Sequence, residues 1–147
     1  MIVIPNVYEG RYKEGDFQWM IKQDEYKDIL FIFNDNEECH NTNYRGGGNA
    51  VIRKYNIYNT KLEKPRSAGI PTGTLENGGY KELTDYVKKQ IDTSIEEIKK
   101  IAKTYEYKKI CYSSEKDGIL GTGIFNVNRD VLIYITEKIK ELEKIDE

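Results

Sequence analysis

The feature that most constrains the fold is an uninterrupted apolar run, Ile-Leu-Phe-Ile-Phe at residues 29–33, bounded by Asp28 and by an Asn-Asp-Asn turn. A run without polar alternation is typical of a strand buried on both faces, and such strands belong to sheets that helices cover. A second interior strand is predicted at residues 109–112, and shorter strands at residues 2–4 and 68–72. These segments supply the expected sheet.

Helices are predicted between and after these strands. Apolar residues recur every three or four positions from Leu83 to Ala102, with charged residues between them, which is typical of an amphipathic helix. Asn128 is placed as the N-cap of a final helix, and a short helix is expected to open at residues 50–52. The alternation of strands and helices favours a single α/β domain over residues 1–147, a three-layer α/β/α sandwich with helices on both faces.

Charge and cysteine content narrow the class of protein. Lys and Arg number 23 against 25 Asp and Glu, so the net charge is −2 and a broad nucleic-acid footprint is not expected. Cys39 and Cys111 lack CxxC spacing, which predicts reduced thiols and a cytoplasmic protein. No apolar stretch approaches the ~20 residues that cross a bilayer, so no membrane association is expected. Nothing in the sequence fixes the oligomeric state.

Three consecutive glycines, Gly46, Gly47 and Gly48, precede the expected helix start at Asn49. Unhindered N–H groups at the start of a helix, together with the helix dipole, form an anion-binding site. Glycine triplets also occur in plain flexible turns, so both interpretations stay open. Arg45, beside the triplet, is a candidate phosphate ligand that otherwise stays solvated.

A second glycine loop follows the strand at residues 109–112. It comprises Gly121, Thr122, Gly123, Ile124 and Phe125. Because ligands bind at the carboxyl ends of strands in such sheets, both glycine loops are expected at one edge, where two anion sites suit a diphosphate. Phe125 is predicted either to cover a ribose or base or to pack in the core. Ser113, at the end of the strand, is expected to line the phosphate loop.

Together these motifs resemble the macro domain, the ADP-ribose-binding fold, over about residues 29–142. They are a strand that ends in an asparagine turn, Gly-Gly-Gly-x-Ala-Val-Ile, and the most specific string, Gly-Thr-Gly-Ile-Phe, before the last helix. Phe-Asn-Asp-Asn and Ala-Gly-Ile-Pro-Thr-Gly resemble segments of divergent macro-like proteins of bacteria and phages. The resemblance implies a macro-domain-like mixed sheet with helices on both faces.

The resemblance also implies roles for individual residues. The glycine triplet becomes the first phosphate-facing loop, and residues 121–125 wrap the diphosphate and distal ribose. Asn34 and Asn36 stand where an asparagine turn orients the distal ribose in the hydrolytic families. With Asp35 between them, they are expected ligand contacts and the catalytic candidates. Pro71 and Thr72, in the Ala-Gly-Ile-Pro-Thr-Gly segment, are further expected ligand contacts. No metal or cofactor is implied.

Two departures from the family pattern shape the functional expectation. Residues 37–45 separate the asparagine turn from the glycine triplet, and no counterpart of the adenine-binding Gly-Asp-Ile turn is found. We therefore expect a domain that binds ADP-ribose, or a cyclic or base-modified derivative, as a reader or as a sponge for a signalling nucleotide. A sponge suits an anti-defence role in a bacterial or phage-infected cytosol. The alternative is an ADP-ribosyl hydrolase that acts on modified macromolecules, and whether the chain is an enzyme stays open.

Other residues allow two interpretations each. Asp35 suits a general base or ribose acceptor, but also a local Asx turn. Phe17 and Trp19 suit either a stacking wall for a base or core anchors. His40, the only histidine, is expected as a solvated loop residue rather than a metal ligand. Arg53 is expected either at a phosphate or in solvent.

Overall fold

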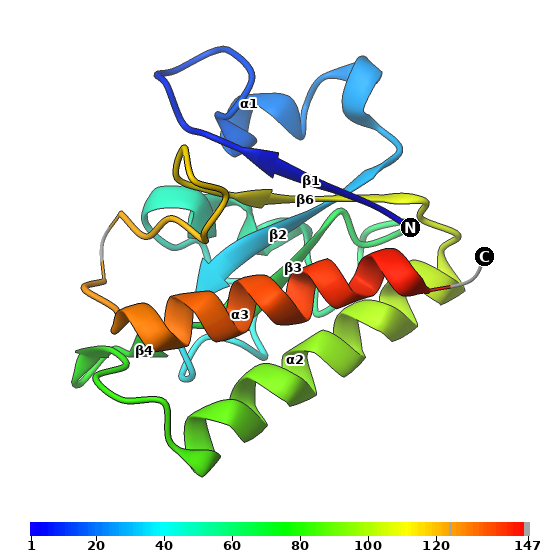
Figure 1. The fold of residues 1–147 in the computed structure, drawn as a ribbon. Coiled ribbons are helices and arrows are strands. Elements are labelled where there is room, and N and C mark those ends of the chain that lie inside the picture. Colours follow the sequence, from blue (N-terminus) through cyan, green and yellow to red (C-terminus); the bar gives the residue numbers. More distant parts are fainter. Residues whose placement is uncertain (124, 146–147) are drawn as a thin grey trace.

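The computed structural model describes residues 1–123 and 125–145, and its centre is a parallel β-sheet. The strands are β1 (Ile2–Asn6), β6 (Lys109–Ser113), β2 (Ile29–Asp35) and β3 (Ser67–Pro71), in that spatial order (Figure 1). Every pairing among them is parallel, so this sheet differs from the mixed sheet that was expected. The antiparallel pairing lies apart, in the short ribbon of β4 (Gly73–Thr74) and β5 (Gly78–Gly79).

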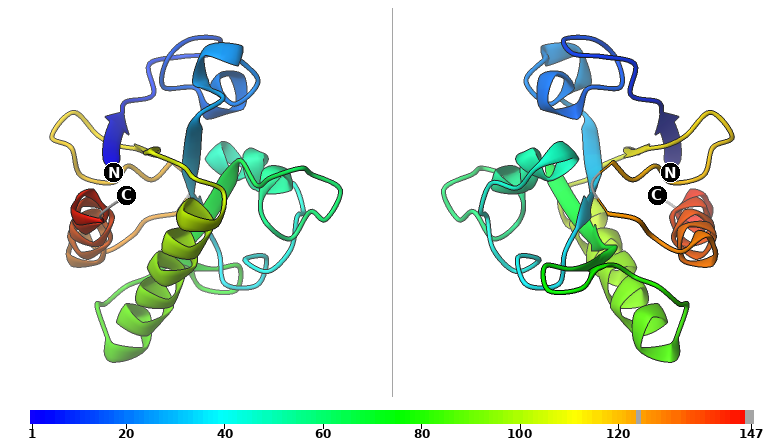
Figure 2. Two further views of the ribbon diagram at one scale, coloured as in Figure 1. Left: turned by 90° about the vertical axis from the view of Figure 1, so that its right-hand side faces the viewer. Right: turned by 90° about the vertical axis from the view of Figure 1, so that its left-hand side faces the viewer.

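Helices cover both faces of the sheet. On one face α2 (Asp85–Thr104) and α3 (Arg129–Glu141) pack over apolar residues of β2, β3 and β6, and η3 (Leu142–Lys144) continues α3. On the other face α1 (Phe17–Met20) and η2 (Gly48–Tyr55) pack over alternate residues of β2, with η1 (Asp24–Tyr26) nearby. Figures 1 and 2 show α2 and α3 on the side of the sheet away from α1. The two apolar clusters explain why the β2 run has no polar alternation.

The expected helices and strands are present. The 83–102 pattern forms α2, whose Thr84 side chain accepts a hydrogen bond from the backbone N–H of Val87. Asn128 caps α3 by accepting from the N–H of Asp130, as the sequence predicted. The helix expected at residues 50–52 is part of the 3₁₀ helix η2. Across the described parts of the chain, we find no helix with the length and apolar character to cross a membrane.

The carboxyl ends of the parallel strands meet at one edge of the sheet. The segments that follow β1, β2 and β6, together with the start of η2, lie around this edge. In Figure 2 (right) the segment after β1 arches over the top of this edge. η2 lies on one side of the edge and the loop after β6 lies on the other. This edge is where the ligand site of a parallel α/β sheet is expected.

Candidate functional site

One cavity of about 1140 Å³ opens at the carboxyl ends of the strands. Most residues that the sequence predicted as ligand contacts line it. They are Asn34, Asp35, Asn36, Arg45, Gly46, Gly47, Gly48, Asn49, Thr72, Ser113, Gly121, Thr122, Gly123 and Phe125. The fold therefore brings both glycine loops and the asparagine turn to a single cavity.

Two expected contacts fall outside this set. Pro71 is a buried residue of β3, in register with Asp35, and does not line the cavity. Its neighbour Thr72 does, because the strand ends there; the Thr72 hydroxyl donates to the carbonyl oxygen of Asp35 at 3.2 Å. Ile124 lies outside the described residues.

The glycine triplet forms the entry to η2. Gly47 is the N-cap and Gly48 has φ +55°, a left-handed conformation that favours glycine. A Cβ on Gly46 would lie only 2.7 Å from the Ala50 Cβ and 2.8 Å from Arg53 Nη1, so this position also requires glycine. Within residues 1–123 and 125–145, no protein acceptor takes the backbone N–H of Gly47 or Gly48. These exposed donors are available to an anion.

The second glycine loop is tied to the sheet through its first glycine. The Gly121 N–H donates to the Ser113 carbonyl at 3.0 Å, and the Gly121 carbonyl accepts from Asn34 Nδ2 at 2.6 Å. Gly123 is exposed, with open space where a Cβ would stand. Phe125 is half-buried; it packs against the core, which was one of its two expected roles, and it also lines the cavity. Its contact with a ribose or base stays a prediction.

A buried ion pair forms the floor of the cavity. Asp35 Oδ1 accepts hydrogen bonds from Arg53 Nε at 2.9 Å and Nη2 at 2.5 Å, and also from the backbone N–H of Asn36 at 2.9 Å. The Asp35 side chain is 0% exposed and that of Arg53 2%. The Arg53 Nη1 donates to the Tyr44 carbonyl. Arg53 is therefore a structural cation, and the solvated position that the sequence suggested for it is wrong.

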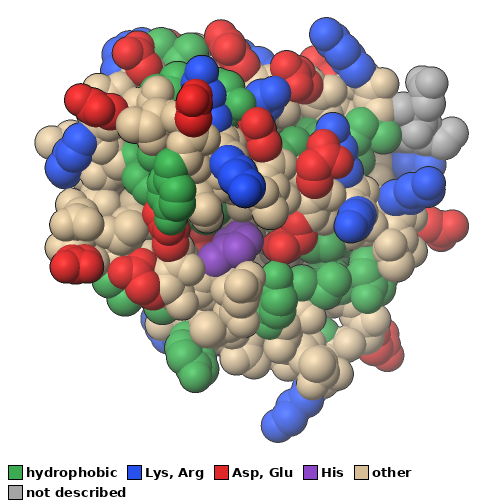
Figure 3. All heavy atoms as spheres, turned by 90° about the horizontal axis from the view of Figure 1, so that it is seen from below, with side chains coloured by type: hydrophobic (Ala, Val, Ile, Leu, Met, Phe, Trp, Pro, Cys, Tyr) green, Lys and Arg blue, Asp and Glu red, His purple; other side chains and the backbone are tan. Residues whose placement is uncertain are grey.

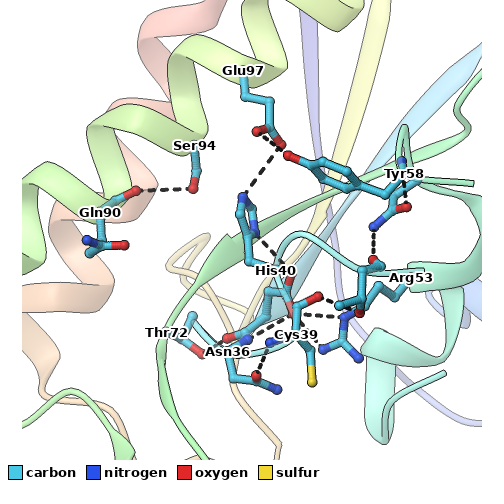
Figure 4. Close-up of polar contacts among 12 residues, drawn as sticks. Asn36, Cys39, His40, Arg53, Tyr58, Thr72, Gln90, Ser94 and Glu97 are labelled. Atoms are coloured by element: carbon cyan, nitrogen blue, oxygen red, sulfur yellow. Dashed lines mark hydrogen bonds and ion pairs between the residues drawn. The ribbon is translucent and has the colours of Figure 1, made fainter. Parts of the chain in front are cut away.

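His40 links this ion pair to the long helix (Figure 4). Its Nδ1 lies 3.1 Å from Asp35 Oδ2 and its Nε2 lies 3.5 Å from Glu97 Oε1 on α2. Tyr58 donates its hydroxyl to the other oxygen of Glu97 at 3.0 Å. The His40 side chain is only 14% exposed, so the solvated loop position expected for this residue is wrong. Figure 3 shows the histidine at a hollow flanked by acidic side chains.

The electrostatics of this cluster favour a protonated histidine. Burial lowers the pKa of His40, but hydrogen bonds to Asp35 and Glu97 and their negative charges outweigh it and raise the pKa to about 9. Burial, followed by the charge of Glu97, raises the pKa of Tyr58 to about 12. The imidazolium then donates from Nδ1 to Asp35 and forms an ion pair through Nε2 with Glu97, which ties the segment at residues 37–45 to β2 and α2.

One wall of the cavity is formed by the segment after β1, of which sequence reasoning weighed only Phe17 and Trp19 as site residues. Val7, Tyr8, Arg11, Tyr12, Asp16, Gln18, Trp19 and Lys22 line the cavity from this segment. Phe17 is fully buried and is a core residue, whereas Trp19 is half-buried at the wall. The signal was present in the aromatic residues after strand 2–4, whose carboxyl end had to meet the same sheet edge.

The cavity is lined by charged side chains of both signs, with more exposed cations than acids. Arg11, Lys22 and Arg45 line it as exposed cations, against the acidic residues Asp16 and Glu115. Asp35 is neutralised by Arg53. Among residues 1–123 and 125–145, no cluster of three or more His, Cys, Asp or Glu side chains is arranged to hold a metal ion.

The chain matches no family model, no curated protein and no solved structure.

Proposed function

We propose that this chain binds ADP-ribose, or a cyclic or base-modified derivative, in the cavity at the carboxyl ends of its strands, and acts as a reader or sponge of that nucleotide. The observation that carries the proposal is the convergence of the two glycine loops, about 75 residues apart, on one cavity. Each loop follows a buried parallel strand, as phosphate-binding loops do in α/β sheets.

The donors and charges suit a diphosphate. The N–H groups of Gly47 and Gly48, at the start of η2, take no protein acceptor within the described residues. Arg45 flanks them as an exposed cation. The cavity volume lies just above the range of ~300–1000 Å³ usual for small-ligand pockets, which suits a long ligand with a base at one end and a ribose at the other.

The fold supports a macro-like interpretation. We interpret the parallel sheet, with apolar clusters on both faces, as a three-layer α/β/α arrangement of the macro kind. The parallel pairing of all four strands and the segment at residues 37–45 then mark this chain as divergent within that class.

The contacts of the catalytic candidates support a binding function rather than hydrolysis. Both carboxylate oxygens of Asp35 are engaged by Arg53 and His40, and its side chain is inaccessible, so it is not free to activate water. Asn34 is committed to the Gly121 carbonyl, and the Asn36 Oδ1 accepts from the N–H of Cys39. These bonds hold the end of β2 in shape, and the buried Asp35 carboxylate is not accessible to a water molecule.

Thermal unfolding with a nucleotide panel tests the proposal. A ligand at about 100 times its Kd stabilises the native state by about 2.7 kcal/mol, so ADP-ribose or a cyclic relative should raise Tm by roughly 5–10 °C. A side chain at Gly123 would meet open space, so Gly123→Asp should fold, and its carboxylate should repel the phosphates and abolish the rise in Tm. Gly123→Asn, which carries an uncharged side chain of the same shape as Asp, should keep most of the rise.

Two results would overturn the assignment. The absence of any Tm rise across ADP-ribose, cyclic ADP-ribose and related dinucleotides would remove the ligand class. Release of ADP-ribose from a mono-ADP-ribosylated protein, at a rate that depends on this chain, would replace the binding function with the hydrolase alternative.

A further inference from the structure

The wall after β1 carries exposed aromatic side chains that the phosphate loops do not explain. Tyr8 and Tyr12 are 53% and 74% exposed, although large apolar rings are costly to leave in water, and both line the cavity. Trp19, the only tryptophan, lines the same cavity from α1. Arg11 and Lys22 lie along the same wall.

The backbone presents Tyr12 in an unusual conformation. Its φ is +63°, a left-handed value that is an outlier for a bulky residue and is held only where the surroundings enforce it. Here the Tyr12 N–H donates to Asp16 Oδ2 at 2.9 Å, and the Asp16 N–H donates to the Lys13 carbonyl at 3.0 Å. These bonds therefore hold the backbone of Tyr12 beside the cavity that its side chain lines.

The base of this segment is closely packed. Gly15 is buried, with its N–H 3.2 Å from the Met20 sulfur, and a Cβ there would lie 2.1 Å from the Val7 carbonyl oxygen. Trp19 is fixed by an edge contact with Tyr26 at 6.4 Å between ring centroids. The backbone of this segment and the Trp19 ring are thus held in place before any ligand enters, which lowers the entropy cost of binding.

We propose that Tyr8, Tyr12 and Trp19, the aromatic wall, hold the base of the bound nucleotide by stacking, while the glycine loops hold its diphosphate. This inference rests on the proposed function and names its second subsite. Asp16, the acidic side chain of the wall, already accepts the Tyr12 N–H. Stacking is tolerant of base identity because every base has a π-face, so the wall selects ligands that carry a planar heteroaromatic base and discriminates little among purines.

Calorimetry with three ligands tests the subsite: ADP-ribose, its hypoxanthine counterpart, and ribose 5-phosphate, which lacks a base. The double variant Tyr8→Ala/Tyr12→Gly removes two exposed rings and relieves the positive φ, so it should fold. It should bind both nucleotides roughly 5- to 100-fold more weakly and leave the weak binding of ribose 5-phosphate unchanged. Tyr44→Ala removes a similarly exposed ring that does not line the cavity, and should bind as wild type does.

Fluorescence of Trp19 gives a second measurement on the wild type. Because the chain has one tryptophan, stacking of the base should quench its emission with ADP-ribose but not with ribose 5-phosphate. Unchanged affinity in the double variant, or a more than tenfold preference for adenine over hypoxanthine, would overturn the stacking subsite and leave the proposed function standing. Failure of the wild type to bind either nucleotide would instead overturn the proposed function.

Discussion

At the scale of single residues, the pair of Asp35 and Arg53 governs the floor of the site. A carboxylate inaccessible to water is costly unless it is paired and hydrogen-bonded, and here Arg53 supplies two donors to one oxygen. The same guanidinium explains why Gly46 has no side chain, since a Cβ would meet it. One ion pair thus couples the end of β2 to the glycine triplet.

Arg53→Met should lower the free energy of unfolding by about 3 kcal/mol, because the buried Asp35 carboxylate loses its bidentate partner and keeps only His40 as a cation. Urea denaturation at neutral pH measures this loss. The matched control is Arg129→Met, which breaks an Arg–Asp pair whose side chains are 67% and 53% exposed and should cost no more than about 1 kcal/mol. Equal, small losses in the two variants would contradict a buried structural pair.

At the scale of elements, the segment at residues 37–45 is fastened to the rest of the fold by polar contacts. His40 lies between β2 and α2, and Glu37 accepts the hydroxyl of Tyr80 at 2.7 Å. The Glu38 carboxylate accepts the N–H of Leu75 at 3.0 Å. These bonds hold the segment beside the cavity, so the asparagine turn and the glycine triplet meet despite the residues between them.

The His40 contacts predict a dependence of stability on pH. The pKa of His40 is about 9 in the folded chain against 6.5 for the free side chain, so protonated His40 stabilises the fold fully below about pH 6.5. That contribution declines as the pH rises and is lost through pH 9. The difference in unfolding free energy between wild type and His40→Gln should therefore be largest near pH 6 and vanish by about pH 9.5.

Urea denaturation at pH 6, 7.5 and 9.5 measures this difference. Glu97→Gln provides a control: it removes one of the two acids around His40, so the His40→Gln effect should be smaller in that background and should vanish at a lower pH. A wild-type advantage that stays constant from pH 6 to pH 9.5 would contradict a protonated His40.

The elements were largely predictable from local patterns, whereas the contacts that shape the site were not. The apolar run of β2 and the periodicity of α2 are encoded within single segments, and so are the caps Thr84 and Asn128. The position of His40 depends on Glu97, far along the chain. Likewise, the segment after β1 has no periodicity to mark it, and only the sheet topology brings Tyr12 to the cavity.

At the scale of the whole molecule, the two faces of the sheet have different roles: one carries the larger core and the other lies beside the cavity. The apolar cluster under α2 and α3 supplies the larger core. The segments around the cavity, at residues 7–22, 45–49 and 113–123, come from the carboxyl ends of strands and from the opposite face. Binding is therefore expected to change the segments around the cavity and to leave the long helices as they are.

Hydrogen exchange tests this division. With ADP-ribose at saturation, amide exchange should slow at residues 7–22, 45–49 and 113–123 together, because a single ligand spans the aromatic wall and both glycine loops. Exchange in the middle of α2 and α3 should change little, since these helices pack on the other face. In Gly123→Asp, which should not bind, all three segments should exchange as in the ligand-free chain. Slowing confined to one segment would contradict a ligand that bridges both subsites, since the shared cavity requires the three segments to respond as a unit.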